Sequence, residues 1–450
     1  MKINITRKPI LLDSIYYFLG AMFLLVDAFY NTYPIIYHDL STYVANGFDL
    51  ETPIDRPITY CLFVRLFSLN GYSLWPVVFV QAYILSFLLF KFMRSSFGRD
   101  IKPIIIMGVI MLLSLFTGIS WTVSQIMPDI FTPMEIIIIS ILVIGEQNKK
   151  QKALLYFLFF LATSMHLSHI SFNITLLFFL FVIKRLNILR FSYYLDYKML
   201  LLLFGITLLG FTTMLSASAK SKHVFFMGAM VEHGILKEFL EDNCSNASYA
   251  ICKYKDDLPS RAYQFVWDEN SPLYKIGGWK SSEIEFNTII LKTLTRPKYI
   301  GLHIKASIIA TIDQLVTFEI NDSNGVFLEG TLPYDRMVRY LPGDLEMYLN
   351  SKQMNNQFGF TDNLNTVFSI IVASSLLIII YLLIKGNVYR EKLLMVLILV
   401  ILGVLLNAWV SGTFANSINR LGCKMTWLIP MISLIGLIQL YINKKASKLS

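Results

Sequence analysis

Charged side chains are scarce in this sequence. Asp, Glu, Lys and Arg make up 15% of its 450 residues and hydrophobic types make up 55%, whereas a typical soluble domain carries about 25% charged residues. Apolar runs of about 17–25 residues, the length that crosses a bilayer as a helix, recur along the chain, and the short alternating strands of a membrane β-barrel are missing. Because lipid offers the backbone no hydrogen-bond partner, the sequence predicts an all-α polytopic membrane protein.

Several motifs of soluble enzymes are also missing. There is no Walker loop, no Rossmann glycine pattern and no GxSxG elbow, so chemistry on ATP or nucleotide sugars has no support. The four cysteines form neither a CxxC pair nor a zinc-binding spacing, and we expect no metal and no cofactor. Cys244 and Cys252 lie close together in a segment assigned below to the outside, where we expect a disulfide. Cys61 and Cys423 are expected to be packing residues.

The positive charge is unevenly distributed. A net charge of +9 is compatible with nucleic-acid binding, but Lys and Arg gather in short loops, such as 149–152 and 444–445, that alternate with loops nearly free of them. This is the positive-inside pattern of membrane proteins. It predicts that both termini face the cytoplasm and that nucleic acid is not a partner. The first apolar run has no small-residue cleavage site after it, so we expect it to remain as a helix.

We expect ten membrane crossings and three parts. The crossings are placed at about 10–30, 73–93, 103–119, 130–145, 153–168, 171–184, 198–216, 365–385, 393–410 and 425–442. The parts are an N-terminal membrane module at 1–216 with an acidic outer loop at 31–72, an extracytoplasmic domain at 217–363, and a C-terminal membrane module at 364–450. The domain is long enough for a core of its own. Residues 57–70, too short to cross, and residues 299–318 are expected to form amphipathic helices at the outer surface.

The first outer loop is unusually polar, because residues 34–60 contain four acidic residues and a single Arg. Asp39 directly follows the first crossing. A carboxylate at the membrane surface can take a proton from an attacking hydroxyl or amine, although a solvated loop acid is the common alternative. The presence of Arg56 in the same loop and of Asp129 in the next outer loop favours a catalytic site.

Two further polar pairs have open interpretations. Asp129 can bind a sugar hydroxyl or act as a second acid, and it can also cap the helix that follows it; we favour the cap. His166 and His169 lie three residues apart at an outer turn. They can contact sugar or phosphate, but no third metal ligand accompanies them, and two satisfied polar side chains is the interpretation we favour.

Arg420 and Lys424 lie in the last outer loop. There they can pair with a lipid phosphate, Arg through two parallel hydrogen bonds and Lys as a point charge, and so neutralise a departing phosphate. The alternative is that both side chains extend to lipid headgroups, which we favour for Lys424.

Part of this pattern resembles the GT-C glycosyltransferases, of which the aminoarabinose and protein O-mannosyl transferases are examples. The resemblance includes Asp39 with Tyr43 after the first helix and the run Arg56-Pro57 to Tyr60 that opens a juxtamembrane helix. The run 419–430, NRLGCKMTWLIP, and residues 249–268 are similar to uncharacterised bacterial members of the group. Two departures are a single Pro after Arg56, where two are common, and a Lys at 424 where Arg is expected.

The resemblance implies a glycosyltransferase of the outer face of the bacterial cytoplasmic membrane. Such an enzyme inverts the sugar as it moves a hexosyl or pentosyl group from a polyprenyl-phosphate donor to a glycan, lipid or protein acceptor of the envelope. Asp39 then matches the catalytic base, with Asp129 as a second acid. Arg420, Lys424 and Arg56 are expected to bind the donor phosphate. The remaining candidate substrate contacts are Tyr43, Tyr60, His166 and His169.

Two other functions remain open. A membrane transporter or lipid flippase is expected to show inverted repeats, broken helices and charge at mid-membrane; no repeat is visible and the polar residues gather at the outer edge, so this function ranks second. The third possibility is a non-catalytic assembly factor whose outer domain binds other envelope proteins.

Overall fold

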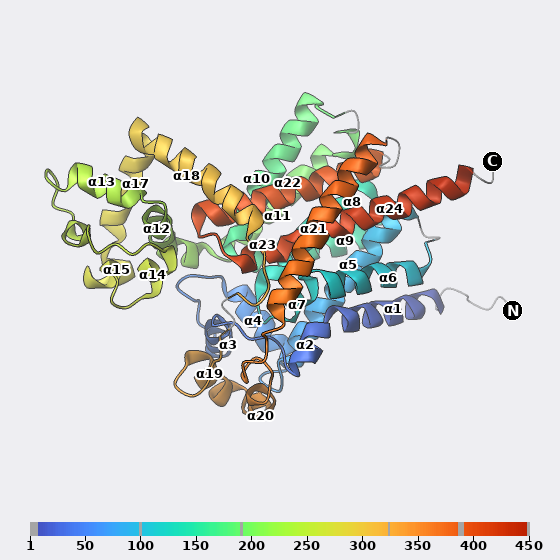
Figure 1. The fold of residues 1–450 in the computed structure, drawn as a ribbon, viewed down its shortest axis with the longest axis horizontal. Helices are drawn as coiled ribbons and strands as arrows, with labels where there is room; N and C mark the ends of the chain where they lie inside the picture. The colour runs from blue at the N-terminus through green and yellow to red at the C-terminus, as the bar shows by residue number, and fades with distance from the viewer. Residues whose placement is uncertain (1–7, 99–100, 190–191, 323–324, 386–390, 448–450) are drawn as a thin grey trace.

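The chain folds into helices (Figure 1). The computed structural model describes residues 8–98, 101–189, 192–322, 325–385 and 391–447. The charged leader before the first apolar run, residues 1–7, lies outside them. Within the described residues the β pairing is limited to one bridge, between Ile35 and Gln125. The predicted all-α class is therefore confirmed for this part of the chain.

The helices fall into three consecutive groups. The first group is α1 (Lys8–Leu24), α2 (Val26–Asn31), α3 (Leu40–Asp49), α4 (Ile58–Phe67), α5 (Trp75–Phe97), α6 (Pro103–Phe116), α7 (Ile119–Ser124), η1 (Pro128–Ile130), α8 (Phe131–Ile144), α9 (Lys149–Ser164), α10 (Leu167–Leu186), η2 (Ser192–Tyr194) and α11 (Tyr197–Thr212). The second is α12 (Leu215–Glu232), α13 (Ile235–Asn243), η3 (Ala250–Tyr254), α14 (Ala262–Trp267), α15 (Pro272–Lys275), α16 (Gly278–Ser281), α17 (Glu283–Thr295), α18 (Pro297–Val316), α19 (Leu332–Tyr340), η4 (Pro342–Asp344) and α20 (Leu345–Leu349). The third is α21 (Thr361–Ile384), α22 (Glu391–Phe414), α23 (Asn419–Thr426) and α24 (Leu428–Ser447).

Five helical segments of the described residues are long and apolar enough to cross a bilayer: α5, α10, α21, α22 and the combined α23–α24 segment. Helices α11 and α12 add a sixth if this pair, which is bent by 83°, forms one span. Residues 12–24 of α1, together with α4 and α6, form shorter apolar helices. These lengths and compositions are those of a membrane protein. The number of ten crossings stays a prediction.

Helix α8 lies at the centre of the bundle. Every residue from Phe131 to Ile144 is buried, and the helix packs against α5, α9 and α22. A helix that is hydrophobic on all sides needs neighbours on all sides, and the isoleucine-rich sequence of α8 meets that condition. Because α8 begins two residues after Asp129, that carboxylate lies at the entrance to the core.

The two ends of the bundle differ. The start of α1 and the end of α24 lie at the same end of the molecule, whereas α3, α19 and α20 lie towards the other end (Figure 1). This arrangement is the one required if both termini face the same side of a membrane.

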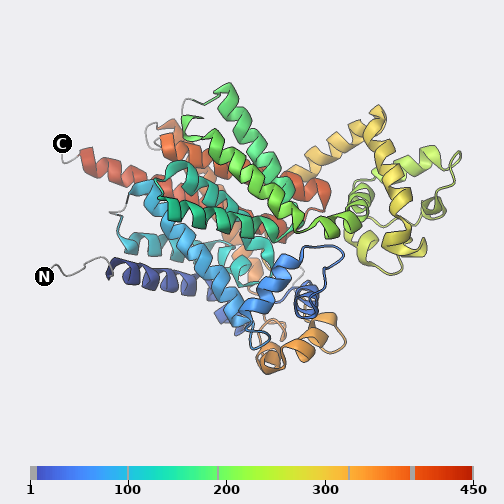
Figure 2. The ribbon, with the colours of Figure 1, turned by 180° about the vertical axis from the view of Figure 1, so that it is seen from behind.

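Helices α12 to α18 build a second hydrophobic core. It contains Phe239, Phe265 and Phe286, and this lobe projects from the bundle in Figure 2. The expected disulfide between Cys244 and Cys252 is present in the lobe. The two other cysteines, Cys61 and Cys423, are buried and free, as expected of packing residues.

Segment 217–363 also contacts the bundle. Helix α18, which belongs to the lobe and overlaps the amphipathic helix expected at 299–318, packs against α22. Beyond it, Met337 and Tyr348 belong to the bundle core. The Asp344 carboxylate accepts hydrogen bonds from Tyr33 Oη at 2.5 Å and from the Leu74 amide at 2.8 Å. The segment thus has two environments, and its status as one inserted domain stays a prediction.

The acidic loop is itself partly helical. It contains α3 and α4, which pack against each other. Helix α4 corresponds to the helix expected at 57–70: Tyr60 and Val64 are buried, while Leu62 and Leu66 are exposed. A helix with these two faces suits a membrane surface, and its interfacial position stays a prediction.

Candidate active site

Backbone pairing positions the start of the acidic loop. The Ile35 amide donates to the Ser124 carbonyl at 2.9 Å and the Ile126 amide donates to the Ile35 carbonyl at 3.1 Å. Gln353 clamps the next residue, since its side chain accepts from the Ile36 amide at 2.9 Å and donates to the Ile36 carbonyl at 2.6 Å. These bonds place Asp39, three residues further on, beside the segment that leads into α8.

Asp39 is the N-cap residue of α3, but its carboxylate makes no capping hydrogen bond. It pairs instead with two guanidinium groups from different parts of the chain. Asp39 Oδ1 lies 3.1 Å from Arg56 Nη1, and Asp39 Oδ2 lies 3.3 Å from Arg420 Nη1. The Asp39 side chain keeps 22% exposure, so this ion cluster has access to solvent.

Arg56 is held at the start of α4. Its Nη2 donates to Asp55 Oδ2 at 2.5 Å and its Nε donates to the same oxygen at 2.9 Å. The guanidinium carbon lies 5.2 Å from the centre of the Tyr43 ring. Although Arg56 Nη1 is close to Asp39, it is buried and not aligned for a hydrogen bond, so this donor can serve another acceptor.

The third side of the cluster comes from α23. Arg420 and Lys424 are four residues apart and therefore lie on one helix face. Arg420 Nη1 lies 3.8 Å from Asp129 Oδ2, and Lys424 Nζ lies 3.5 Å from Asp129 Oδ1. Arg420 also stacks over Tyr37, at 4.3 Å from the ring centre. Its buried Nε has no hydrogen-bond acceptor among the described residues.

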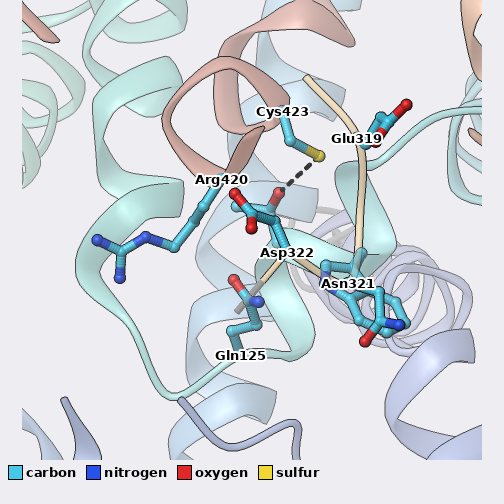
Figure 3. Close-up of a pocket in the computed structure, with 8 residues that line it drawn as sticks. Gln125, Glu319, Asn321, Asp322, Arg420 and Cys423 are labelled. Carbon is cyan, nitrogen blue, oxygen red and sulfur yellow. Dashed lines mark hydrogen bonds between the residues drawn. The ribbon is translucent and has the colours of Figure 1, made fainter. Parts of the chain in front are cut away.

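The short segment after α18 fixes the start of α23. Asp322 accepts a hydrogen bond from the Asn419 amide at 2.9 Å, and Asn419 Oδ1 accepts one from the Glu319 amide at 2.9 Å. Figure 3 shows a small pocket at this place, lined by Arg420 together with Gln125, Glu319 and Asp322. Segment 319–322 and Arg420 line the same pocket, so this segment lies next to the cluster.

The surrounding charges determine the protonation of the two acids. Burial alone would raise the pKa of Asp39, but attraction to Arg56 and Arg420 outweighs burial and lowers this pKa to about 2. Burial opposes ionisation of Asp129 as well, and Arg420 and Lys424 likewise hold its pKa below the usual value. Both acids are therefore ionised at neutral pH. Three carboxylates, counting Asp55, balance three cations, so a bound anion must compete with a carboxylate for them.

Two expectations about this cluster were wrong. Asp129 does not cap the helix that follows it: the N-cap of α8 is Ile130, and neither α8 nor η1 has a side-chain cap. The attraction of Arg420 and Lys424 holds the Asp129 carboxylate away from the helix end. Lys424 does not extend to lipid headgroups, because its side chain is 2% exposed and pairs with Asp129. A buried ammonium needs such a counter-charge.

Tyr43 and Tyr60 support the cluster from below. Both are buried, and their rings meet edge to face with centres 4.7 Å apart. Tyr60 Oη donates to Gln81 Oε1 at 2.7 Å, and Gln81 Nε2 donates to the carbonyls of Val123 and Gln125. Both tyrosines thus position the site, and direct contact with a substrate stays a prediction for them.

The two histidines lie beneath Asp129. His169 is buried and uses both ring nitrogens within the protein: Nε2 lies 2.7 Å from Thr132 Oγ1 and Nδ1 lies 2.7 Å from the Ala162 carbonyl. This is the geometry of a satisfied polar residue. His166, at the N-terminus of α10, contacts Ser168 Oγ at 2.8 Å and remains partly exposed. Among the described residues, no group of three or more His, Cys, Asp or Glu is arranged to hold a metal.

Several residues of the site were missed from the sequence. Tyr37 stacks on Arg420, Gln81 connects Tyr60 to the segment before Asp129, and Gln353 clamps the acidic loop. Tyr37 lies only two residues before Asp39, which is a weak signal. Gln353 lies far from the loop in the sequence, and no local pattern points to it.

Comparison with known proteins gives no further guide, because no protein family, no curated protein and no solved structure matches this chain.

Proposed function

We propose that this protein is a membrane-embedded glycosyltransferase that moves a sugar from a polyprenyl-phosphate donor to an envelope acceptor. One observation carries the proposal: Asp39 after the first helix and Arg420 before the last helix meet in an ion pair of 3.3 Å. A carboxylate able to accept a proton thereby lies beside a cation able to bind phosphate. Sugar transfer from a lipid phosphate needs both groups within one substrate length.

The donor phosphate takes its place among the guanidinium groups. Arg420 Nε is a buried donor without a hydrogen-bond acceptor among the described residues, and Arg56 Nη1 faces only the Asp39 carboxylate, at 3.1 Å; an anionic oxygen satisfies such donors well. As the bond between the sugar anomeric carbon and the phosphate oxygen breaks, these donors stabilise the negative charge left on the lipid phosphate. Lys424, which is paired with Asp129, supplies positive charge from behind.

Asp39 takes the proton of the acceptor. The acceptor oxygen attacks the anomeric carbon and inverts its configuration, and its proton moves to the Asp39 carboxylate. In the free enzyme this carboxylate is a weak base, since Arg56 and Arg420 hold its pKa at about 2. A donor phosphate that competes for the same two cations weakens this hold. Donor binding then raises the pKa of Asp39 and turns it into a better base.

The proposal includes an orientation in the membrane. With ten crossings, α1, α6, α8, α9 and α11 complete the bundle, and the cluster lies on the outer face of the cytoplasmic membrane. The lobe of α12 to α18 then lies outside, in an oxidising compartment where its disulfide is stable. The glycan, lipid or protein acceptor approaches from this side.

The substitution Asp39→Asn tests the proposal. Membranes that contain this variant are expected to transfer a radiolabelled sugar from a polyprenyl-phosphate donor at least about 100-fold more slowly, the lower range for loss of a general base. Glu51→Gln is the matched control, since Glu51 is an exposed acid of the same loop. Wild-type transfer by Asp39→Asn, with the variant present at normal amounts, contradicts the assignment.

A transporter or lipid flippase is the alternative, and two observations favour it. Helices α11 and α12 form a pair bent by 83°, as broken transport helices do. Glu135 is buried in α8, where Thr163 and Asn173 donate hydrogen bonds to its Oε1 at 3.0 and 2.8 Å. Reconstituted vesicles distinguish the functions: donor-independent movement of a labelled lipid between leaflets supports the alternative, and sugar transfer in detergent excludes it as the main activity.

A further inference from the structure

A second hollow lies away from the cluster, between the lobe and α22. This lobe groove has a volume of about 630 Å³, which is within the range of about 300–1,000 Å³ that is typical of ligand pockets. Its walls come from α12, α13, α17, α18 and α22. The lining residues include Met230 of α12, Ile304 and Ile308 of α18, and Leu405 and Trp409 of α22.

The lining chemistry favours an apolar ligand. None of the lining residues is Asp, Glu, Lys or Arg. The polar groups bond to one another or to nearby protein atoms: Ser307 Oγ lies 2.8 Å from Thr413 Oγ1 and accepts from Trp409 Nε1 at 2.9 Å. His233 and His303 are also hydrogen-bonded within the protein. A peptide would bring backbone groups that find few partners here, whereas a hydrocarbon chain requires none.

The walls of the groove place it next to lipid. One wall is the end of α22, a helix long and apolar enough to cross the bilayer. The adjoining wall is α18, which packs against α22 and on which Ile304, Ile308 and Ile312 are 57%, 57% and 58% exposed and recur every four residues. An exposed apolar stripe of this kind marks an interaction surface. Beside a membrane-spanning helix, the apolar partner at hand is the bilayer.

The length of the groove fits one lipid chain. The lining residues of α18 run from His303 to Leu315, a distance of about 18 Å at a rise of about 1.5 Å per residue. One leaflet contributes about 15 Å of hydrocarbon to the bilayer core. An acyl chain long enough to cross one leaflet is therefore about as long as the groove.

We propose that the lobe groove binds one acyl chain of a glycerophospholipid from the neighbouring leaflet. The lipid ties the lobe to the membrane beside α22. The proposal does not depend on sugar transfer, because the groove contains no residue of the Asp39–Arg420 cluster.

Photo-crosslinking tests the proposal on the full-length protein in vesicles. The vesicles contain phosphatidylglycerol and phosphatidylethanolamine, a small part of which carries a diazirine near the end of one acyl chain. After irradiation and digestion, we expect the label on groove residues such as Met230 and Leu405. Excess unlabelled phospholipid is expected to reduce it, whereas an equal excess of a polyprenyl phosphate leaves it in place.

Two neighbouring residues give a matched pair of variants. Ile308 and Ile309 are both exposed on α18, at 57% and 48%, but only Ile308 lines the groove. Ile308→Trp fills the groove and is expected to lower crosslinking by about fivefold or more, since a packed space rejects added volume. Ile309→Trp is expected to leave it within about twofold. If Ile308→Trp fails to accumulate, Leu405→Trp fills the groove from the α22 wall.

Three results overturn the proposal. The first is equal labelling of the Ile308→Trp and Ile309→Trp variants. The second is label spread over all faces of the membrane helices without enrichment in the groove. The third is displacement of the label by polyprenyl phosphate but not by phospholipid, which assigns the groove to a carrier lipid.

Discussion

Asp39 lies between two guanidinium groups, and this position sets the basicity that the proposed reaction requires of it. With a folded pKa of about 2, below the ordinary value of about 3.9, the charged carboxylate stabilises the folded state above the ordinary pKa. That contribution disappears as the pH falls through about 2. In the physiological range the protein without a ligand therefore holds Asp39 ionised, and only a change in its two partners alters its basicity.

The pH dependence of transfer follows from this argument. We expect kcat/KM, which reports the free enzyme, to show no acidic limb from Asp39 between about pH 5 and 7. The acidic limb of kcat, which reports the complex, is expected at a higher pH than that of kcat/KM, because the donor phosphate draws Arg420 and Arg56 away from the carboxylate. Steady-state rates across this range measure both. Coinciding limbs contradict the competition between phosphate and Asp39.

Asp129 and Lys424 form a buried pair, and a buried charge without its partner is costly. Lys424→Met alone is expected to destabilise the protein by up to about 3 kcal/mol, because it leaves Asp129 with Arg420, 3.8 Å away, as its only neighbouring cation among the described residues. Adding Asp129→Asn is expected to recover most of this loss, since both charges are then gone. Thermal unfolding of the two single variants and the double variant measures the coupling. Additive losses in the double variant show that the two residues do not depend on each other.

At the scale of elements, the acidic loop is held by helices far away in the sequence. Tyr340 of α19 donates to Asp49 at 2.7 Å, and Asp344 receives hydrogen bonds from Tyr33, Ser73 and Leu74. A loop that must present Asp39 to Arg420 needs such support, because a polar loop alone has no fixed conformation. The segment after α18 therefore supports the loop of the candidate site without touching Asp39 or Arg420.

Asp344→Ala tests this support. Asp344 is 1% exposed, so its removal leaves buried donors unsatisfied and is expected to cost about 3 kcal/mol. Amide hydrogen exchange in α3 and residues 34–39 is expected to rise as the loop loosens. Asp335→Ala, at an exposed position of α19, is the control and is expected to change stability by less than about 0.5 kcal/mol. If amide hydrogen exchange in the loop is unchanged in the Asp344→Ala variant, contacts other than those of Asp344 hold the loop in place.

At the scale of the whole molecule, the bundle and the lobe differ in what surrounds them. The lobe has its own core and a disulfide, while the bundle contains the helices of spanning length. If the orientation proposed above holds, the lobe and the cluster face outside and the loop between α8 and α9 faces the cytoplasm.

Cysteine accessibility tests this orientation, since Cys61 and Cys423 are buried. A membrane-impermeant thiol reagent added to intact cells is expected to label Glu269→Cys in the lobe and to leave Glu146→Cys, between α8 and α9, unlabelled. Both positions are exposed in the structure. Inverted membrane vesicles are expected to give the opposite result. If both positions are labelled from the same side, they lie on the same side of the membrane, which contradicts the proposed topology.

Local patterns along the chain were enough to predict the all-α class, the position of most long helices and the disulfide. These follow from local properties: helical periodicity, apolar run length and the spacing of two cysteines. Which charges meet depends on the packing of distant helices and could not be predicted from those patterns. Asp39 and Arg420 are 381 residues apart, and Asp129 and Lys424 pair instead of capping a helix or reaching lipid headgroups. Such contacts depend on which helices pack side by side, because a buried charge pairs with an opposite charge that is close in space, whatever their separation in the sequence.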